Sequence, residues 1–165
     1  HLRQKDKDDK LGILDVRVLL NNKEQIDIEI QVTASEYWAE RTLFYLGKMF
    51  TDQLKPGEDY QKLEKCIHVG ILNFTLFDDE EYYSRFHFWS DQGRKMYSDK
   101  FEIHTLELPK LAKHEYPETE LLKWLQFINA ETEEEFEMAA EKSEYIKKAY
   151  RLLWSCFRKW NWKKK

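Results

Sequence analysis

Two neighbouring segments of the chain carry acidic residues among apolar ones. Asp15 interrupts a segment rich in Leu, Ile and Val, and Asp27, Glu29 and Gln31 follow at intervals of two. Successive side chains of a β-strand point to opposite faces, so the last three would share one face. Paired carboxylates on one face can hold Mg²⁺, which prefers oxygen ligands. A bound Mg²⁺ polarises a phosphoryl oxygen and activates an attacking water, so the pattern could support hydrolysis of a phosphodiester.

The turn between the two segments decides which carboxylates face each other. Residues 21–23 are Asn-Asn-Lys, which is typical of a turn because Asn tolerates left-handed backbone. If these three residues form the loop, Leu20 pairs with Glu24, and the same register places Asp15 opposite Glu29. Directly opposed residues of an antiparallel pair have Cβ atoms roughly 4.5–5.5 Å apart. We therefore predict a β-hairpin in which these two carboxylates can share a cation.

A simpler interpretation is an exposed hairpin whose polar face contacts only water. Like charges that face each other destabilise an antiparallel pair unless solvent or a metal relieves them. Asp15 favours the metal, because it interrupts an apolar strand and a half-buried carboxylate needs a partner. The pattern alone leaves both interpretations open.

The elements around the hairpin predict an α/β fold. The hairpin spans residues 11–32, and apolar residues at helical spacing predict a helix over residues 36–54, with Ser35 as its cap. A nearly continuous apolar run over residues 66–74 predicts a central strand with both faces covered. Alternating patterns predict two more strands, and residues 90–100 read as a connector between them. These two strands cover residues 83–89 and 101–108.

A boundary between Pro109 and Pro117 divides the chain into two parts. We predict a mixed central sheet flanked by helices over residues 1–112. From Pro117 onward the apolar spacing is helical, which predicts an α-helical C-terminal extension over residues 113–165. The acidic run from Glu131 is typical of the start of a helix, where negative charge suits the helix dipole.

The composition is that of a globular protein, with 42% hydrophobic residues in 165. The net charge of −4 argues against a general DNA-binding protein that covers the phosphate backbone, because such a protein is usually basic. A nuclease needs basic groups only where it contacts DNA. No apolar run approaches the roughly 20 residues of a membrane helix, and no signal peptide stands out. Cys66 and Cys156 match no metal spacing and are best interpreted as buried small hydrophobes. We expect a cytoplasmic protein with no membrane association.

The hairpin motif resembles the signature of a known nuclease superfamily. Asp15, followed after a short hairpin by Glu29-Ile30-Gln31, is similar to the D…(D/E)xK signature of the PD-(D/E)XK nucleases, with Gln in the Lys position. The wider context of both strands, with Arg41 and Tyr45 in the next helix, resembles the Rpn-type recombination-promoting nuclease/transposase family. This resemblance covers roughly residues 5–153.

The resemblance implies a restriction-endonuclease-like core and a Mg²⁺-dependent DNA endonuclease of the type used in transposition or recombination. It assigns metal binding to Asp15, Glu29 and Ile30, and it assigns catalysis to Asp15, Glu29 and Gln31. The residues expected to contact DNA phosphate are Arg41 and Tyr45. Mn²⁺ is expected to substitute for Mg²⁺, and no small-molecule cofactor is expected. The expected partner is DNA, with a homodimer as one further arrangement.

Two departures from the family keep other functions open. Gln31 cannot supply the positive charge with which Lys stabilises the pentavalent phosphate. The N-terminal helical segment of the family is missing, and the sequence after Leu153 no longer resembles the family; both features predict a truncated copy. One alternative is therefore a catalytically inactive remnant that binds DNA or a partner protein. Another is a small interaction domain with an incidental polar hairpin.

Two further sets of residues allow alternative interpretations. Trp38, Arg41 and Tyr45 would share one helix face, where Arg41 could contact phosphate or pack its aliphatic part on the sheet. Each of three predicted strands also carries one histidine: His68, His87 and His104. They could bind a metal together, although lone histidines on strands usually have a structural role.

Overall fold

The structure is a computed structural model that describes residues 14–21 and 23–162, with side chains described for residues 16–21 and 23–155. It forms two compact units, His1–Lys113 and His114–Lys165. Within the described residues, no helix is long and apolar enough to cross a membrane.

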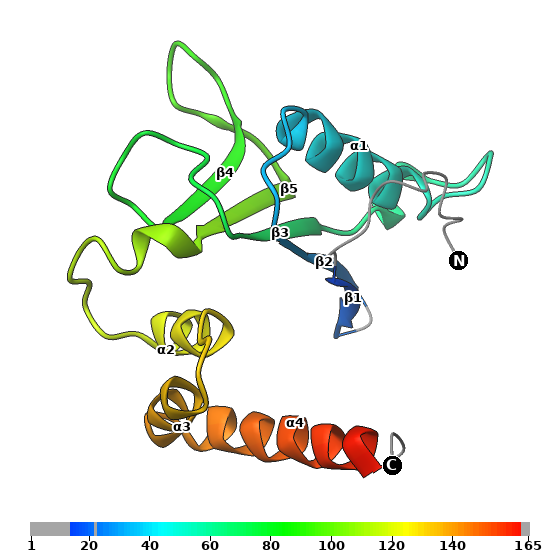
Figure 1. The fold of residues 1–165 in the computed structure, drawn as a ribbon. Helices are drawn as coiled ribbons and strands as arrows, with labels where there is room; N and C mark the ends of the chain where they lie inside the picture. The colour runs from blue at the N-terminus through cyan, green and yellow to red at the C-terminus, as the bar shows by residue number, and fades with distance from the viewer. Residues whose placement is uncertain (1–13, 22, 163–165) are drawn as a thin grey trace. The chain divides into compact units, whose positions relative to one another are not determined.

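The N-terminal unit contains a mixed sheet of five strands in the order β1-β2-β3-β5-β4 (Figure 1). The strands are β1 (Leu14–Leu20), β2 (Glu24–Gln31), β3 (Cys66–Leu72), β4 (Tyr83–Trp89) and β5 (Met96–Glu107). Strands β2, β3 and β5 are parallel, whereas β1 and β4 are antiparallel to their neighbours. The predicted central strand is confirmed, because β3 lies in the middle of the sheet.

Helix α1 (Trp38–Thr51) connects β2 to β3 and lies on one face of the sheet (Figure 1). Its buried Leu46 and Met49 pack with Cys66 of β3. Cys66 is fully buried, which confirms its interpretation as a buried small hydrophobe, and this burial raises the pKa of its thiol to about 11. The predicted cap at Ser35 is wrong: the helix begins after Tyr37, and no side chain caps it.

Strand β5 is longer than the sequence predicts. It begins at Met96, inside the expected connector, because Phe88 and Trp89 of β4 pair with Ser98 and Met96. Register shifts at this point interrupt the alternation that would reveal the strand in the sequence. Two short 3₁₀ helices complete the unit, at Tyr60–Lys62 and Leu108–Lys110.

The C-terminal unit is helical, as predicted. It contains α2 (Glu120–Ile128), α3 (Glu133–Glu141) and α4 (Glu144–Trp162), with a core of Phe127, Ala139, Ala140 and Ile146. Thr132 and Glu135 form a capping box at the start of α3, so the acidic run does begin a helix.

Glycine substitutions at two positions should test how closely α1 approaches the sheet. A Cβ at Gly70 would lie 2.5 Å from Cζ2 of buried Trp38. We expect Gly70→Ala to lower the free energy of unfolding by about 1–3 kcal/mol, because the ring cannot move without disturbing the core. The matched change is Gly47→Ala within α1, where a Cβ meets nothing within 4 Å. It should raise stability by about 0.5–1 kcal/mol.

Urea denaturation followed by circular dichroism measures the change in the free energy of unfolding that each glycine substitution causes. Opposite signs for the two variants would confirm that the tight approach of Trp38 to β3 is specific. A neutral or stabilising Gly70→Ala would show that α1 tolerates a larger spacing from the sheet.

Candidate functional site

The hairpin has the register that its turn predicts. Asp15 pairs with Glu29 across β1 and β2, and Leu20 pairs with Glu24 at the turn. Asn21 has a φ of 51°, which is the left-handed backbone that Asn tolerates. The side chain of Asp15 lies outside the described residues, so its position is known from the backbone register.

The polar face of β2 is buried. Asp27, Glu29 and Gln31 are only 5%, 4% and 8% exposed. The isoleucines on the other face of the strand are less deeply buried: Ile26, Ile28 and Ile30. The interpretation of this face as an exposed surface in contact with water is therefore wrong. Burial of two carboxylates is costly, so each needs a compensating partner.

Arg41 supplies one such partner. Its Nη2 lies 2.7 Å from Oε1 of Glu29, and both side chains are largely buried. The guanidinium carbon of Arg41 also lies 5.8 Å from the centre of the Tyr45 ring, which is a cation–π distance. Trp38 on the same helix face is buried and packs on the sheet. The helix face thus combines packing with a charged group directed at Glu29, and the contact with phosphate remains a prediction.

His68 of β3 contacts the second buried carboxylate. Its Nδ1 lies 3.2 Å from Oδ2 of Asp27, which is its neighbour in the parallel register. Arg17 of β1 approaches the same carboxylate at 3.9 Å. The His68 ring is fully buried and lies 5.7 Å from the ring of Trp38. Sequence analysis missed this pair, because the register between two parallel strands joined by a helix leaves no local signal.

The amide nitrogen of Gln31 forms a hydrogen bond with the backbone. Its Nε2 donates to the carbonyl of Thr33 at 3.0 Å. Its Oε1 is buried and has no hydrogen-bond partner among the residues that the structure describes. A buried amide oxygen in this condition can accept a hydrogen bond from a ligand or a water molecule.

The donors near Glu29 fit a cation with oxygen ligands. Glu29 offers a carboxylate, Asp15 lies opposite it in the register, and Ile30 could contribute only its carbonyl oxygen. This set contains the oxygen donors that Mg²⁺ prefers. Among the residues with described side chains, no group of three His, Cys, Asp or Glu side chains is placed to hold a metal ion. Because Asp15 is outside that set, its part in a metal site remains a prediction.

A second polar cluster surrounds Glu102 on the opposite face of the sheet. Its buried carboxylate is contacted by four side chains at 2.7–3.2 Å: Lys65, Arg85, His87 and His104. His68 pairs with Ile103, so it points to the other face from His104. The three strand histidines therefore do not form one site.

The Glu102 cluster should make stability depend on pH. Burial opposes ionisation of Glu102, but hydrogen bonds from Arg85, Lys65 and His104 outweigh it and hold its pKa far below the usual value. A depressed pKa contributes stability above the unfolded-state value of about 4.3, and this contribution is lost as the pH falls below it. We expect Glu102→Gln to cost about 1.5–3 kcal/mol at pH 7.

Chemical denaturation across the pH range measures this linkage. The difference in unfolding free energy between wild type and Glu102→Gln should shrink steadily from about pH 5 downwards. Glu64→Gln is a suitable control, because Glu64 is partly exposed and its nearest cation, Lys100, lies 3.9 Å away. If the difference in unfolding free energy between wild type and Glu102→Gln stayed constant with pH, this would contradict a depressed pKa of Glu102.

Comparison with known proteins identifies a family. A family model described as PD-(D/E)XK nuclease family transposase matches residues 1–159 of the chain. The match continues past Leu153, so the expectation that the resemblance ends there is wrong. Searches of curated proteins and of solved structures gave no significant match.

Proposed function

The chain belongs to the PD-(D/E)XK nuclease family transposases, and from this membership we propose that it hydrolyses DNA phosphodiesters with the help of a divalent cation. The proposed cofactor is Mg²⁺, with Mn²⁺ as a substitute, and the proposed substrate is DNA. The proposed site comprises Asp15, Glu29 and Gln31, with Ile30 as a further metal ligand.

The observation that carries this proposal is the burial of the polar face of β2. A strand without a function on that face would gain most by burying its isoleucines and leaving its carboxylates in water. The opposite arrangement occurs here, with Glu29 at 4% exposure and Gln31 at 8%. A cation held on this face would offset the cost of removing the carboxylates from water.

Each residue of the proposed site has a chemical role. Asp15, Glu29 and the carbonyl of Ile30 would hold the cation. When bound, a Mg²⁺ ion polarises a phosphoryl oxygen and lowers the pKa of a ligated water. The Oε1 of Gln31 can accept a hydrogen bond from the attacking water and orient it. Arg41 positions the Glu29 carboxylate through their 2.7 Å contact.

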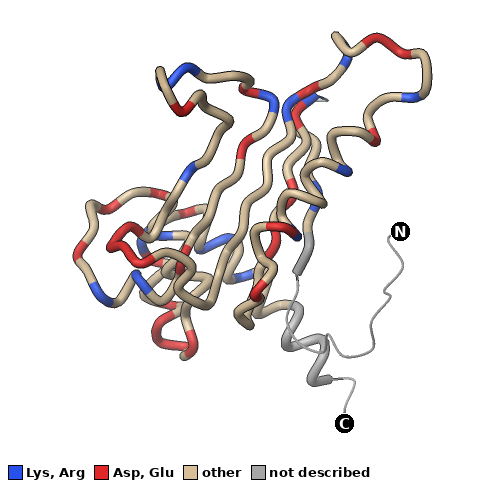
Figure 2. Tube along the Cα trace, turned by 90° about the horizontal axis from the view of Figure 1, so that it is seen from above, with Lys and Arg blue, Asp and Glu red and all other residues tan. Residues whose placement is uncertain are grey.

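Gln31 distinguishes this site from one with Lys at the same position. A neutral amide cannot neutralise charge that develops on the phosphate, so catalysis would depend more on the cation and on basic groups nearby. Figure 2 shows Lys and Arg distributed over many parts of the chain. Arg41 and Tyr45 are the proposed contacts for DNA phosphate, because Arg41 lies beside Glu29.

Nicking of supercoiled plasmid tests the proposal. We expect the full chain to convert supercoiled plasmid to the open circular form with Mg²⁺ or Mn²⁺, and to lose this activity when EDTA is added. Circular dichroism before the assay establishes that the protein is folded. Folded protein that neither nicks supercoiled plasmid nor cleaves single-stranded DNA with either metal would contradict the proposal.

A catalytically inactive module that binds DNA or protein is the second candidate. The neutral Gln31 and the engagement of Glu29 by Arg41 favour it, because both reduce what the site offers a reacting phosphate. Electrophoretic mobility shift of labelled DNA without nicking would support this alternative. The expected homodimer is also a proposal, and sedimentation velocity would test it.

A further inference from the structure

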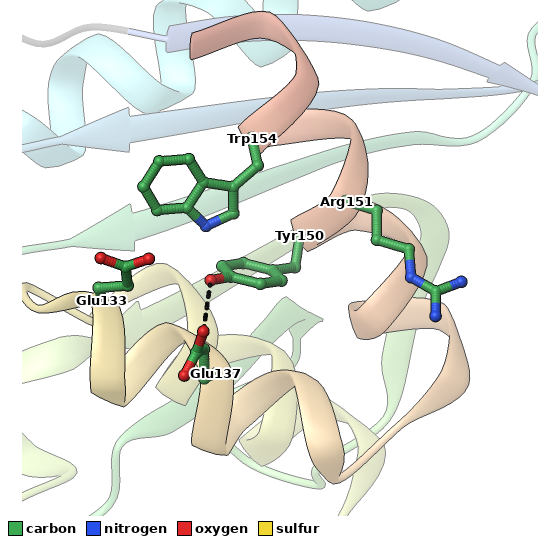
Figure 3. Close-up of a pocket in the computed structure, with 5 residues that line it drawn as sticks. All are labelled: Glu133, Glu137, Tyr150, Arg151 and Trp154. Carbon is green, nitrogen blue, oxygen red and sulfur yellow. Dashed lines mark hydrogen bonds between the residues drawn. The ribbon is translucent and has the colours of Figure 1, made fainter. Parts of the chain in front are cut away.

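A pocket of about 400 Å³ is lined by described residues of the C-terminal unit. It is lined by Glu133 and Glu137 of α3 and by Tyr150, Arg151 and Trp154 of α4 (Figure 3). Glu133 and Glu137 are four residues apart on one helix, and so are Tyr150 and Trp154 on the other. This spacing places each pair on a single helix face.

Two aromatic rings form one wall of the pocket. The rings of Tyr150 and Trp154 are 6.1 Å apart and nearly perpendicular, at 87°. The hydroxyl of Tyr150 donates a hydrogen bond to Oε1 of Glu137 at 3.3 Å, which fixes the orientation of the ring. Perpendicular rings offer the face of one ring and the edge of the other, and a ring face attracts cations.

The opposite wall is negatively charged. The carboxylates of Glu133 and Glu137 both lie on the pocket side of α3, close to the Tyr150 hydroxyl (Figure 3). Burial raises the pKa of Tyr150, and the charges of Glu137 and Glu133 raise it further, which agrees with this closeness. Neither carboxylate forms an ion pair with any residue whose side chain is described.

Arg151 does not neutralise these carboxylates. It lines the pocket, but its guanidinium is directed away from Glu133 and Glu137 (Figure 3). Among the described side chains, the pocket therefore combines two carboxylates and an aromatic wall with no cation between them. An anionic ligand such as a DNA phosphate would be repelled, whereas an organic cation would meet complementary charge on one side and ring faces on the other.

We propose that this pocket binds an organic cation, which is either the ammonium or guanidinium group of a Lys or Arg side chain or the alkylammonium group of a free polyamine. The carboxylates attract the charge, and the Tyr150 and Trp154 rings contact the alkyl part and the cationic head. All of the described lining residues belong to the C-terminal unit, so this proposal does not depend on the nuclease activity proposed above.

A titration of the full-length chain followed by nuclear magnetic resonance tests the proposal. The indole N–H of Trp154 is a reporter inside the pocket, and its signal is assigned by its loss in Trp154→Phe. We expect butylammonium and butylguanidinium to shift this signal in a saturable way, with dissociation constants on the order of millimolar. The neutral 1-pentanol should give no saturable shift. Binding should weaken as salt is added, because screening reduces the attraction.

Charge-matched variants distinguish binding in the pocket from the nonspecific attraction of cations to a negatively charged chain. The double variant Glu133→Gln/Glu137→Gln should bind butylammonium at least about tenfold more weakly. The control Glu134→Gln/Glu141→Gln removes the same charge from exposed positions of α3 that do not line the pocket, and it should retain affinity within about twofold. Circular dichroism establishes that both variants are folded.

The source of the cation is distinguished by two further ligands. Acetyl-Gly-Lys-Gly-amide represents a side chain of a partner protein, and spermidine represents a free polyamine. Tighter binding of either one supports the pocket and identifies its source. No saturable shift with any cation up to about 50 mM would overturn the proposal. An equal loss of affinity in the control double variant would overturn it as well.

Discussion

Glu29→Gln should lower the rate of metal-dependent plasmid nicking by roughly 10³-fold or more. Gln has nearly the same volume and still offers an oxygen to Arg41, which lies 2.7 Å from Glu29. The substitution therefore removes the negative charge while it preserves the packing beneath α1. A neutral oxygen holds a hard divalent cation much more weakly than a carboxylate does. The measurement is the initial rate of open-circle formation at saturating Mg²⁺.

Two further variants show whether the effect belongs to the proposed site. Asp15→Asn should cause a loss of similar size, because its backbone lies directly opposite Glu29. Glu24→Gln removes the same charge from the first residue of β2, at the turn end of the hairpin, and should leave the rate within about twofold. Folded Glu29→Gln that nicks at the wild-type rate would contradict the assignment of Glu29 to the metal.

The hairpin could be predicted in detail because its signals are local. Period-two alternation defined the strands, and the length of the turn fixed which residues oppose each other, so Asp15 and Glu29 were paired correctly. The positive φ of Asn21 agrees with the residue type at the turn. The start of α3 was also predicted from a local signal, the acidic run from Glu131, and the structure adds a capping box of Thr132 and Glu135 at the same place.

The sequence could not show which face of β2 is buried. Alternation distinguishes the two faces, but burial depends on the position of α1, which covers the polar face. That position depends on contacts between distant segments, such as Trp38 of α1 against Gly70 of β3. The contact of Arg41 with Glu29 follows from the same packing. An alternating strand is usually inferred to bury its apolar face. For β2 this inference is wrong, because its polar face is the more deeply buried one.

A buried lysine after β5 could not be predicted from the sequence. Lys110 follows Pro109 in a segment that reads as a polar boundary between the two parts of the chain. In the structure Lys110 is only 1% exposed, and Glu107 is equally buried. Their partners lie about thirty residues earlier in the chain, in the segment before β4, so no local pattern could reveal the interaction.

Lys110→Met should lower the free energy of unfolding by about 3–5 kcal/mol, because it leaves the buried carboxylate of Glu107 without its neighbouring cation. The Lys110 ammonium donates to Oε1 of Glu107 at 3.0 Å, to Oδ1 of Asp79 at 2.7 Å and to the carbonyl of Glu81 at 3.0 Å. These three acceptors match its three hydrogens. Methionine can fill the space of the alkyl chain but can donate none of the three hydrogen bonds.

A double-mutant cycle separates the buried charge from the loss of packing. Glu107 also accepts hydrogen bonds from the backbone N–H groups of Leu76 and Phe77, so Glu107→Gln keeps an acceptor for this segment. When it is combined with Lys110→Met, it should recover a large part of the loss, because no unbalanced charge stays buried. Lys62→Met breaks only an exposed pair with Glu58 and should change stability little. Chemical denaturation measures the free energy of unfolding of wild type and of these four variants. A loss below about 1 kcal/mol for Lys110→Met would mean that water reaches this carboxylate and replaces the lysine.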